Sequence, residues 1–88
     1  MRWPCVCCGC FTLSEPTGES DDICQVCYWQ DDLVDNRDTE LLGPNHVRLS
    51  VARANYKRLG AHEERWLPHV RAPRQEELPP HARRATKL

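Results

Sequence analysis

The chain has 88 residues, a formal net charge of −1 and an aromatic content of 7%. This length holds one domain, and so small a core often needs a metal ion or disulfides to stabilise it. No stretch approaches the length of a membrane span, and the pI near 6.4 is unlike that of a dedicated nucleic-acid-binding domain, which is usually above about 9.

The small net charge conceals an uneven distribution along the chain. Residues 15–40 carry nine acids against Arg37 alone, a net of −8, whereas residues 41–88 carry ten bases and four acids, a net of +6. The two parts can attract each other across the fold, or they can offer separate faces to partners of opposite charge.

The six cysteines allow two interpretations. A secreted small protein would join them in disulfides, but the first residues, Met-Arg-Trp-Pro-Cys, lack the apolar run of a signal peptide. In a reducing compartment, clustered cysteines hold a metal ion more often than they form disulfides. We therefore expect a cytoplasmic protein with a metal site.

The cysteines form two CxxC pairs with fifteen residues between them, a spacing typical of paired zinc knuckles. Each pair supplies two thiolates from one tight turn, and Gly9 directly after the first pair suits the strained backbone of such a turn. Tetrahedral Zn²⁺ takes four thiolates at about 2.3 Å. The predicted zinc ligands are Cys5, Cys8, Cys24 and Cys27.

Cys7 and Cys10 form a competing pair with the same spacing, but Phe11 rather than glycine follows it. Whether either replaces a predicted ligand stays open. As spare residues they are small buried apolar side chains, or else one is a reactive thiol whose pKa the nearby metal lowers. Four thiolates leave no open position for a substrate, so we expect a structural site. Iron on the same sulfurs would instead indicate an electron carrier.

Short strands are expected beside the two cysteine turns. Residues 11–13 form a β-type run, and residues 14–20 have turn chemistry. Trp29 directly follows the second pair and is expected in the core over the metal site. The acidic residues 30–46 predict a loop with a helical turn near Asp31–Asp35.

Residues 48–59 predict the clearest helix of the chain. Its apolar residues recur at spacings of three, four and three and form one face, which consists of Leu49, Ala52, Tyr56 and Leu59. Gly60 fits the position just past a helix end, and the basic residues near it suit the helix dipole.

The C-terminal part predicts little regular structure. Residues 63–67 could form a second short turn that Pro68 ends. From Ala72 onward, prolines and charges predominate, so this segment can bury little surface. We therefore expect a metal-binding domain over residues 1–78 and a flexible, partly extended basic tail over residues 79–88.

No catalytic arrangement is marked by the sequence. The four histidines lack paired ligand spacing and are expected at the surface or at helix caps, although His46 or His62 could replace a cysteine ligand. No Ser/His/Asp or Cys/His arrangement is visible, and one glycine before Pro44 supplies too few N–H groups for a phosphate loop. We expect that the protein is not an enzyme.

Partner binding is the alternative to catalysis. Asp31 and Asp32 are either a solvated loop that suits a helix start or a docking patch for a basic partner, and Trp66 with the basic tail is a second candidate surface. Nucleic-acid binding through the basic residues of the predicted helix and tail is an alternative that predicts a steep salt dependence. Thiol-redox chemistry at Cys7 and Cys10 is another.

The cysteine motif resembles the bacterial cysteine-rich CPCC domain family. The resemblance rests on Trp3–Gly9, on Asp22–Asp32, and on a pattern that continues through Gly43-Pro44-Asn45 to Pro73-Arg74. It covers about residues 3–77. Val6 stands where the family typically has the proline of its name, and Cys10 stands where an aromatic residue is usual, so the packing of the first knuckle differs. The resemblance implies a small metal-binding domain and supplies no reaction.

These observations predict a small α+β fold, a zinc-ribbon-like double knuckle with short antiparallel strands and one C-terminal helix packed on it. The predicted function is a zinc-stabilised interaction module without catalytic activity that binds another protein and no membrane. One concrete version is a bacterial immunity or accessory protein whose acidic face meets a basic active site.

Overall fold

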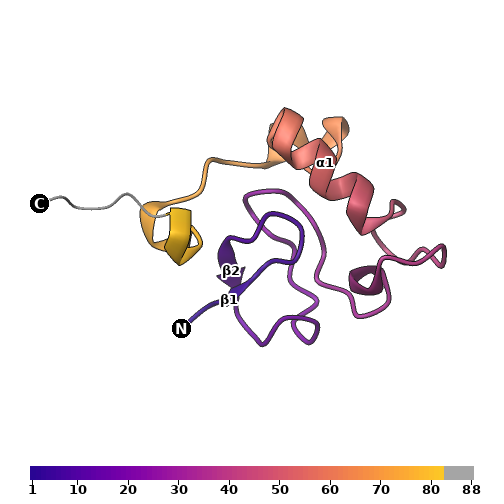
Figure 1. Cartoon of the computed structure of the whole chain (residues 1–88), viewed down its shortest axis with the longest axis horizontal. Helices are drawn as coiled ribbons and strands as arrows, with labels where there is room; N and C mark the ends of the chain where they lie inside the picture. The colour runs from indigo at the N-terminus through magenta and orange to yellow at the C-terminus, as the bar shows by residue number, and fades with distance from the viewer. Residues whose placement is uncertain (83–88) are drawn as a thin grey trace, which may run out of the picture.

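The computed structural model describes residues 1–82 and begins with an antiparallel hairpin (Figure 1). Strand β1 (Trp3–Pro4) pairs with β2 (Phe11–Leu13), with Trp3 opposite Leu13 and Pro4 opposite Phe11. The first CxxC pair occupies the turn between the strands. A hairpin this short is not stable by itself in water, so its order depends on what packs against the turn.

A second turn of similar design follows without regular strands. Ile23 and Gln30 form an isolated antiparallel bridge, and Cys24 and Cys27 lie in the turn between them. The strands expected beside this pair are thus reduced to one bridge. Trp29 is fully buried, as predicted, and its indole Nε1 donates a hydrogen bond of 2.9 Å to Asn36 Oδ1.

The acidic segment is an ordered loop that its own carboxylates hold. It contains one short 3₁₀ helix, η1 (Asp35–Arg37), close to the predicted helical turn. Asp35 is buried and accepts hydrogen bonds from the backbone N–H groups of Gly43 (2.6 Å) and Asn45 (2.9 Å). The Asp35 carboxylate therefore stands in for the strand or helix partners that this loop backbone lacks.

Helix α1 (Leu49–Leu59) confirms the predicted helix within one residue. Leu49 and Ala52 are buried, whereas Tyr56 and Leu59 on the same face are partly exposed. The helix ends at Gly60, which has a φ of 92° and whose N–H binds the carbonyl of Tyr56, as the sequence predicted.

The core lies between α1 and the two cysteine turns. Its buried residues are mostly cysteines, and they are Cys5, Cys7, Cys10, Cys24, Val26, Cys27, Trp29, Leu49 and Ala52. Few of these are large apolar side chains, so burial alone gives this core modest stability. A cluster of sulfur atoms therefore takes the place that leucines and phenylalanines fill in larger domains.

The chain after α1 crosses back to the hairpin in short 3₁₀ helices, η2 (Glu64–His69), η3 (Gln75–Glu77) and η4 (Pro80–Ala82) (Figure 1). The predicted turn at residues 63–67 exists, but it runs through Pro68 to His69, so the expectation that Pro68 ends it was wrong. Pro68 lacks a backbone N–H, and it is tolerated because a 3₁₀ helix this short contains few backbone hydrogen bonds that require one.

The segment near residue 77 is tied to the rest of the domain by an ion pair. Arg71 donates two bonds of 2.8 Å to the Glu77 carboxylate and also contacts the side chain of Gln25. Of the predicted tail, residues 79–82 contain η4, and residues 83–88 lie outside the described part of the chain. Within residues 1–82, no helix is both long and apolar enough to cross a membrane.

Candidate functional site

The first cysteine turn, residues 5–10, is closed by three hydrogen bonds. The N–H of Cys5 donates to the carbonyl of Cys10 at 2.9 Å, and the N–H of Gly9 donates to the carbonyl of Cys5 at 2.8 Å. The N–H of Cys10 points at the Sγ of Cys8 at 3.4 Å. Gly9 has a φ of 80°, a conformation that glycine adopts without cost, so the predicted role of this glycine is confirmed.

The second cysteine turn, residues 24–29, repeats the same three bonds. Cys24 N–H donates to the Trp29 carbonyl at 2.8 Å, Tyr28 N–H donates to the Cys24 carbonyl at 2.7 Å, and Trp29 N–H points at the Sγ of Cys27 at 3.4 Å. Tyr28 takes the place of Gly9 and has a φ of 72°. Such a backbone costs a residue with a side chain about 1–2 kcal/mol, and no local pattern predicts it at Tyr28.

The two turns bring four sulfurs together. The Sγ atoms of Cys5, Cys8, Cys24 and Cys27 all lie within 4.8 Å of one another. Cys5 Sγ is 3.6 Å from Cys27 Sγ, and Cys8 Sγ is 3.7 Å from Cys24 Sγ. A tetrahedron of sulfurs about 2.3 Å from a central ion has edges of about 3.8 Å, so the cluster suits a metal ion. The predicted grouping of these cysteines is confirmed.

Cys7 and Cys10 are not part of this four-sulfur cluster. Both are buried in the core, and among the described residues the four-atom cluster consists of the predicted pairs alone. Cys10 hydrogen-bonds Cys8 and Cys7 hydrogen-bonds Cys27, so both lie beside the cluster without belonging to the group of four sulfurs that could hold one ion.

Comparison with known families bears on the same residues. A family model described as Cysteine-rich CPCC matches residues 3–77. The chain belongs to this family. The match confirms the resemblance that the two cysteine pairs and the residues around them indicated. No curated protein and no solved structure gives a match.

The clustered sulfurs of the CPCC domain shift one another's pKa through hydrogen bonds. Hydrogen bonding to Cys10 and Cys24 raises the pKa of the Cys8 thiol, and bonding to Cys24 and Cys5 raises the pKa of Cys27. Bonds donated chiefly by Cys27 and Cys5 lower the pKa of Cys24. These opposite shifts come from hydrogen bonds among closely packed sulfurs, and thiols that bind a divalent ion release their protons.

Thr12 is a site residue that the sequence did not reveal. It lies on β2, and its hydroxyl donates a hydrogen bond of 3.0 Å to Cys24 Sγ. Donors to a coordinating sulfur offset its negative charge and orient it. The sequence shows a threonine two residues after Cys10, but this position does not indicate which sulfur its hydroxyl reaches.

Asp31, the first residue of the acidic pair, is buried in the CPCC domain. Asp31 is 1% exposed and accepts bonds from the N–H of Gly18 (2.8 Å), the hydroxyl of Ser20 (2.7 Å) and the amide of Asn36 (2.8 Å). Burial alone would raise the pKa of Asp31, but these bonds outweigh it and lower the pKa. The proposal of Asp31 as a docking residue was therefore wrong, since its carboxylate is engaged inside the fold.

Asp32 and Trp66 remain at least partly exposed. Asp32 Oδ2 accepts the N–H of Asp35, the first residue of η1, at 3.0 Å, which agrees with the predicted place of this acid near a helix start. Trp66 stacks against Tyr28 with 4.7 Å between ring centroids, and the Arg65 guanidinium lies 4.5 Å from the Trp66 centroid. Both residues can contribute to a surface, but they also stabilise the segments to which they belong.

His62 corrects another expectation. The histidines were expected at the surface, yet His62 is 1% exposed and packs edge-on against Trp29. Its backbone N–H (2.8 Å) and its Nδ1 (3.0 Å) both contact the carbonyl of Cys27. Burial lowers the pKa of His62, which favours the neutral ring. His62 does not belong to the four-sulfur cluster, so it does not replace a cysteine there, and it supports the second cysteine turn instead.

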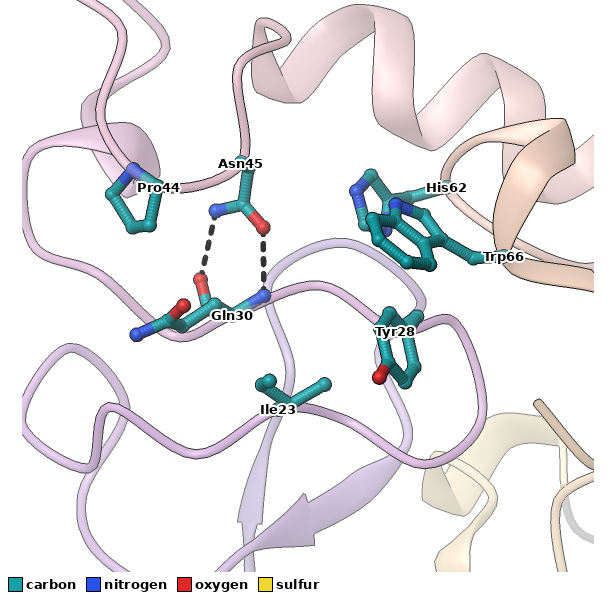
Figure 2. A pocket seen from close by; sticks show the side chains of 7 residues that line it. All are labelled: Ile23, Tyr28, Gln30, Pro44, Asn45, His62 and Trp66. Carbon is teal, nitrogen blue, oxygen red and sulfur yellow. Dashed lines mark hydrogen bonds between the residues drawn. The ribbon is translucent and has the colours of Figure 1, made fainter. Parts of the chain in front are cut away.

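A pocket of about 240 Å³ lies beside that turn (Figure 2). Its walls come from three segments, namely residues 23–30 of the second cysteine turn, residues 44–45, and His62 with Trp66 after α1. The pocket could not be predicted from the sequence, because no local pattern indicates that these three segments lie together.

Proposed function

We propose that the CPCC domain binds one structural Zn²⁺ and acts as a non-catalytic protein-interaction module. In this proposal its fold is a zinc-ribbon-like double knuckle, with Cys5 and Cys8 on one knuckle and Cys24 and Cys27 on the other. The observation that carries it is the cluster of four sulfurs within 4.8 Å of one another, two of whose separations, 3.6 and 3.7 Å, are close to the edge of a zinc–sulfur tetrahedron.

Zinc is the ion that this donor set favours. Thiolates are soft ligands, and four of them in a tetrahedron suit either zinc or a single iron ion. The two backbone N–H groups and the Thr12 hydroxyl that face the sulfurs would offset the net negative charge of a zinc–tetrathiolate centre. A zinc-loaded domain is colourless, whereas iron on the same sulfurs absorbs visible light, so one spectrum separates the two.

The burial of the cluster supports a structural role. Cys5, Cys24 and Cys27 are buried, and Cys8 is only partly exposed. An ion held by all four would have neither an open coordination position nor a free path for a substrate. Its binding free energy would instead be folding free energy, which the small apolar core of this domain needs.

The surface of the acidic segment supports partner binding. Three leucines within residues 33–42 are exposed, with Leu33 at 57%, Leu41 at 69% and Leu42 at 46%. Glu19 and Glu40, both within the wider acidic stretch of residues 15–40, are exposed as well. Exposed apolar side chains together with exposed acids fit a partner with a basic, partly apolar surface. A bacterial immunity or accessory protein that covers a basic active site is one form of this function.

The nucleic-acid alternative has less support from α1. Arg48, at the start of α1, forms an ion pair with Asp38. The Nε of Arg53 donates a hydrogen bond of 2.8 Å to the carbonyl of Val6. These cations are partly committed inside the domain. A mobility-shift assay at low salt tests this alternative directly, since binding through phosphates weakens steeply as salt rises.

Affinity capture tests the interaction function. The zinc-loaded domain is used as bait in bacterial lysate, beside a charge-reversed variant carrying Glu19→Lys and Glu40→Lys. The matched control reverses the exposed Arg37 to Glu. We expect one partner that the control retains and the acidic variant loses. Capture that is equal for all three baits would refute docking through the acidic segment.

A further inference from the structure

The pocket beside the second cysteine turn is too small for an extended ligand. Its volume of about 240 Å³ is below the roughly 300–1,000 Å³ typical of sites for drug-sized molecules. Tyr28 and Trp66 give it an aromatic wall, and Ile23, 46% exposed, lies at the pocket as an apolar residue (Figure 2). These dimensions and walls suit one flat ring.

His62, one of the lining residues, has a hydrogen-bonding atom without a partner. Its Nε2 is buried and has no hydrogen-bond partner, and it is the only such side-chain atom among the described residues. Glu63 Oε1 lies 4.0 Å from Nε2, which is too far for a hydrogen bond. Buried polar atoms are nearly always paired, so this exception indicates a missing partner.

The hydrogen bond on the other side of the ring fixes what that partner must be. His62 Nδ1 lies 3.0 Å from the carbonyl oxygen of Cys27, which can only accept, so Nδ1 carries the hydrogen. In the neutral ring Nε2 then presents a lone pair. The missing partner is therefore a hydrogen-bond donor.

The rest of the lining excludes a charged ligand. None of the seven lining residues carries a carboxylate, an ammonium or a guanidinium group. The Asn45 amide is already committed, because its Oδ1 accepts from the N–H of Gln30 and its Nδ2 donates to the Gln30 carbonyl and to Asp35. A charge placed here would lose its hydration without gaining a counter-ion.

We propose that this pocket binds an aromatic ring with a single N–H or O–H donor, contributed by a tryptophan or tyrosine side chain of a partner protein, with the donor on His62 Nε2. This inference rests on the proposed interaction function. Tryptophan and tyrosine dominate binding energy at protein interfaces and need a partner for their polar atom when buried. Water does not reach Nε2 in the free domain, so the partly exposed Trp66 beside His62 shifts when the ring enters.

Titration of the zinc-loaded domain with small probes, followed by NMR, tests the donor requirement on the unaltered chain. Indole and phenol are the probes, and 1-methylindole and anisole are matched controls that keep the ring but lack the donor. We expect shifts at Trp66, Tyr28 and the His62 ring nitrogens, and binding about tenfold tighter for indole and phenol than for the methylated controls. Equal affinity for both kinds of probe, or shifts that avoid the pocket, would overturn the inference.

The variant Ile23→Trp places the domain's own ring at the pocket and should abolish indole binding while zinc content stays the same. The same variant used as bait separates this inference from the interaction function. Loss of the partner with Ile23→Trp supports a partner side chain in the pocket. Undiminished capture by a variant that no longer binds indole would overturn that assignment and leave docking through the acidic segment standing.

Discussion

Replacing Thr12 by valine removes one hydrogen-bond donor from the metal cluster and keeps the shape of the side chain. The Thr12 hydroxyl lies 3.0 Å from Cys24 Sγ. A hydrogen bond to a charged acceptor contributes about 1.5–3 kcal/mol, and each 1.4 kcal/mol is a factor of about ten in affinity. Because Thr12 is partly exposed, we expect the lower end, a zinc affinity about tenfold weaker.

Competition with a chromophoric chelator at fixed pH measures this affinity. Folding and zinc binding are coupled, so any destabilised variant also loses some apparent affinity. Thr17→Val is the matched control, since the Thr17 hydroxyl donates its hydrogen bond of 2.7 Å to the carbonyl of Pro4 and not to a cysteine sulfur. Thr12→Val should weaken zinc binding clearly more than this control does.

Cobalt substitution gives a readout that general destabilisation would not move. The sulfur-to-cobalt charge-transfer band should shift to lower energy in Thr12→Val, because the sulfur loses a donor, and should stay in place in Thr17→Val. Equal affinities for the two variants together with identical cobalt spectra would refute the role assigned to Thr12.

Three further predictions concern residues outside the four ligands. Cys7→Ser and Cys10→Ser should each retain one zinc per chain by metal analysis, and a loss as complete as that of a ligand variant would contradict the assignment. Asp31→Asn should lower the free energy of unfolding by about 1–3 kcal/mol in denaturant titrations, because Asp31 accepts several bonds in a buried place. An unchanged midpoint would show that those bonds are dispensable. Hydrogen bonds from Arg71 hold the pKa of Glu77 at about 2, below its ordinary 4.5, so its stabilisation is complete above pH 4.5 and is lost only as pH falls towards 2. Glu77→Gln should therefore destabilise the domain equally at pH 6 and pH 8, and a difference that changes over that range would count against the pair.

Features fixed by neighbouring residues were predictable from the sequence. The CxxC turns depend on a few adjacent bonds, and Gly9 marks the backbone conformation that the first turn needs. Helix α1 follows from the spacing of its apolar face and from Gly60 at its end. In each case the physical cause lies within one or two turns of chain, where the sequence displays it directly.

Features fixed by distant residues were not predictable. His62 is buried because the carbonyl of Cys27, 35 positions away, binds it twice. Asp31 belongs to an acidic run that looks solvated, yet the N–H groups of Gly18 and Ser20 need an acceptor that no strand supplies. The pocket exists only because three separate segments meet, so composition and periodicity carry no sign of it.

A direct test of the proposed four-cysteine zinc site is to identify the bound metal and its coordinating atoms. X-ray absorption at the zinc edge, on protein purified without added metal, counts the sulfur neighbours and measures their distance. We expect one zinc per chain with four sulfurs at about 2.3 Å, in the unaltered protein and in Cys7→Ser and Cys10→Ser alike. Protein that folds without metal, or zinc with fewer than four sulfurs, would contradict a closed structural site formed by Cys5, Cys8, Cys24 and Cys27.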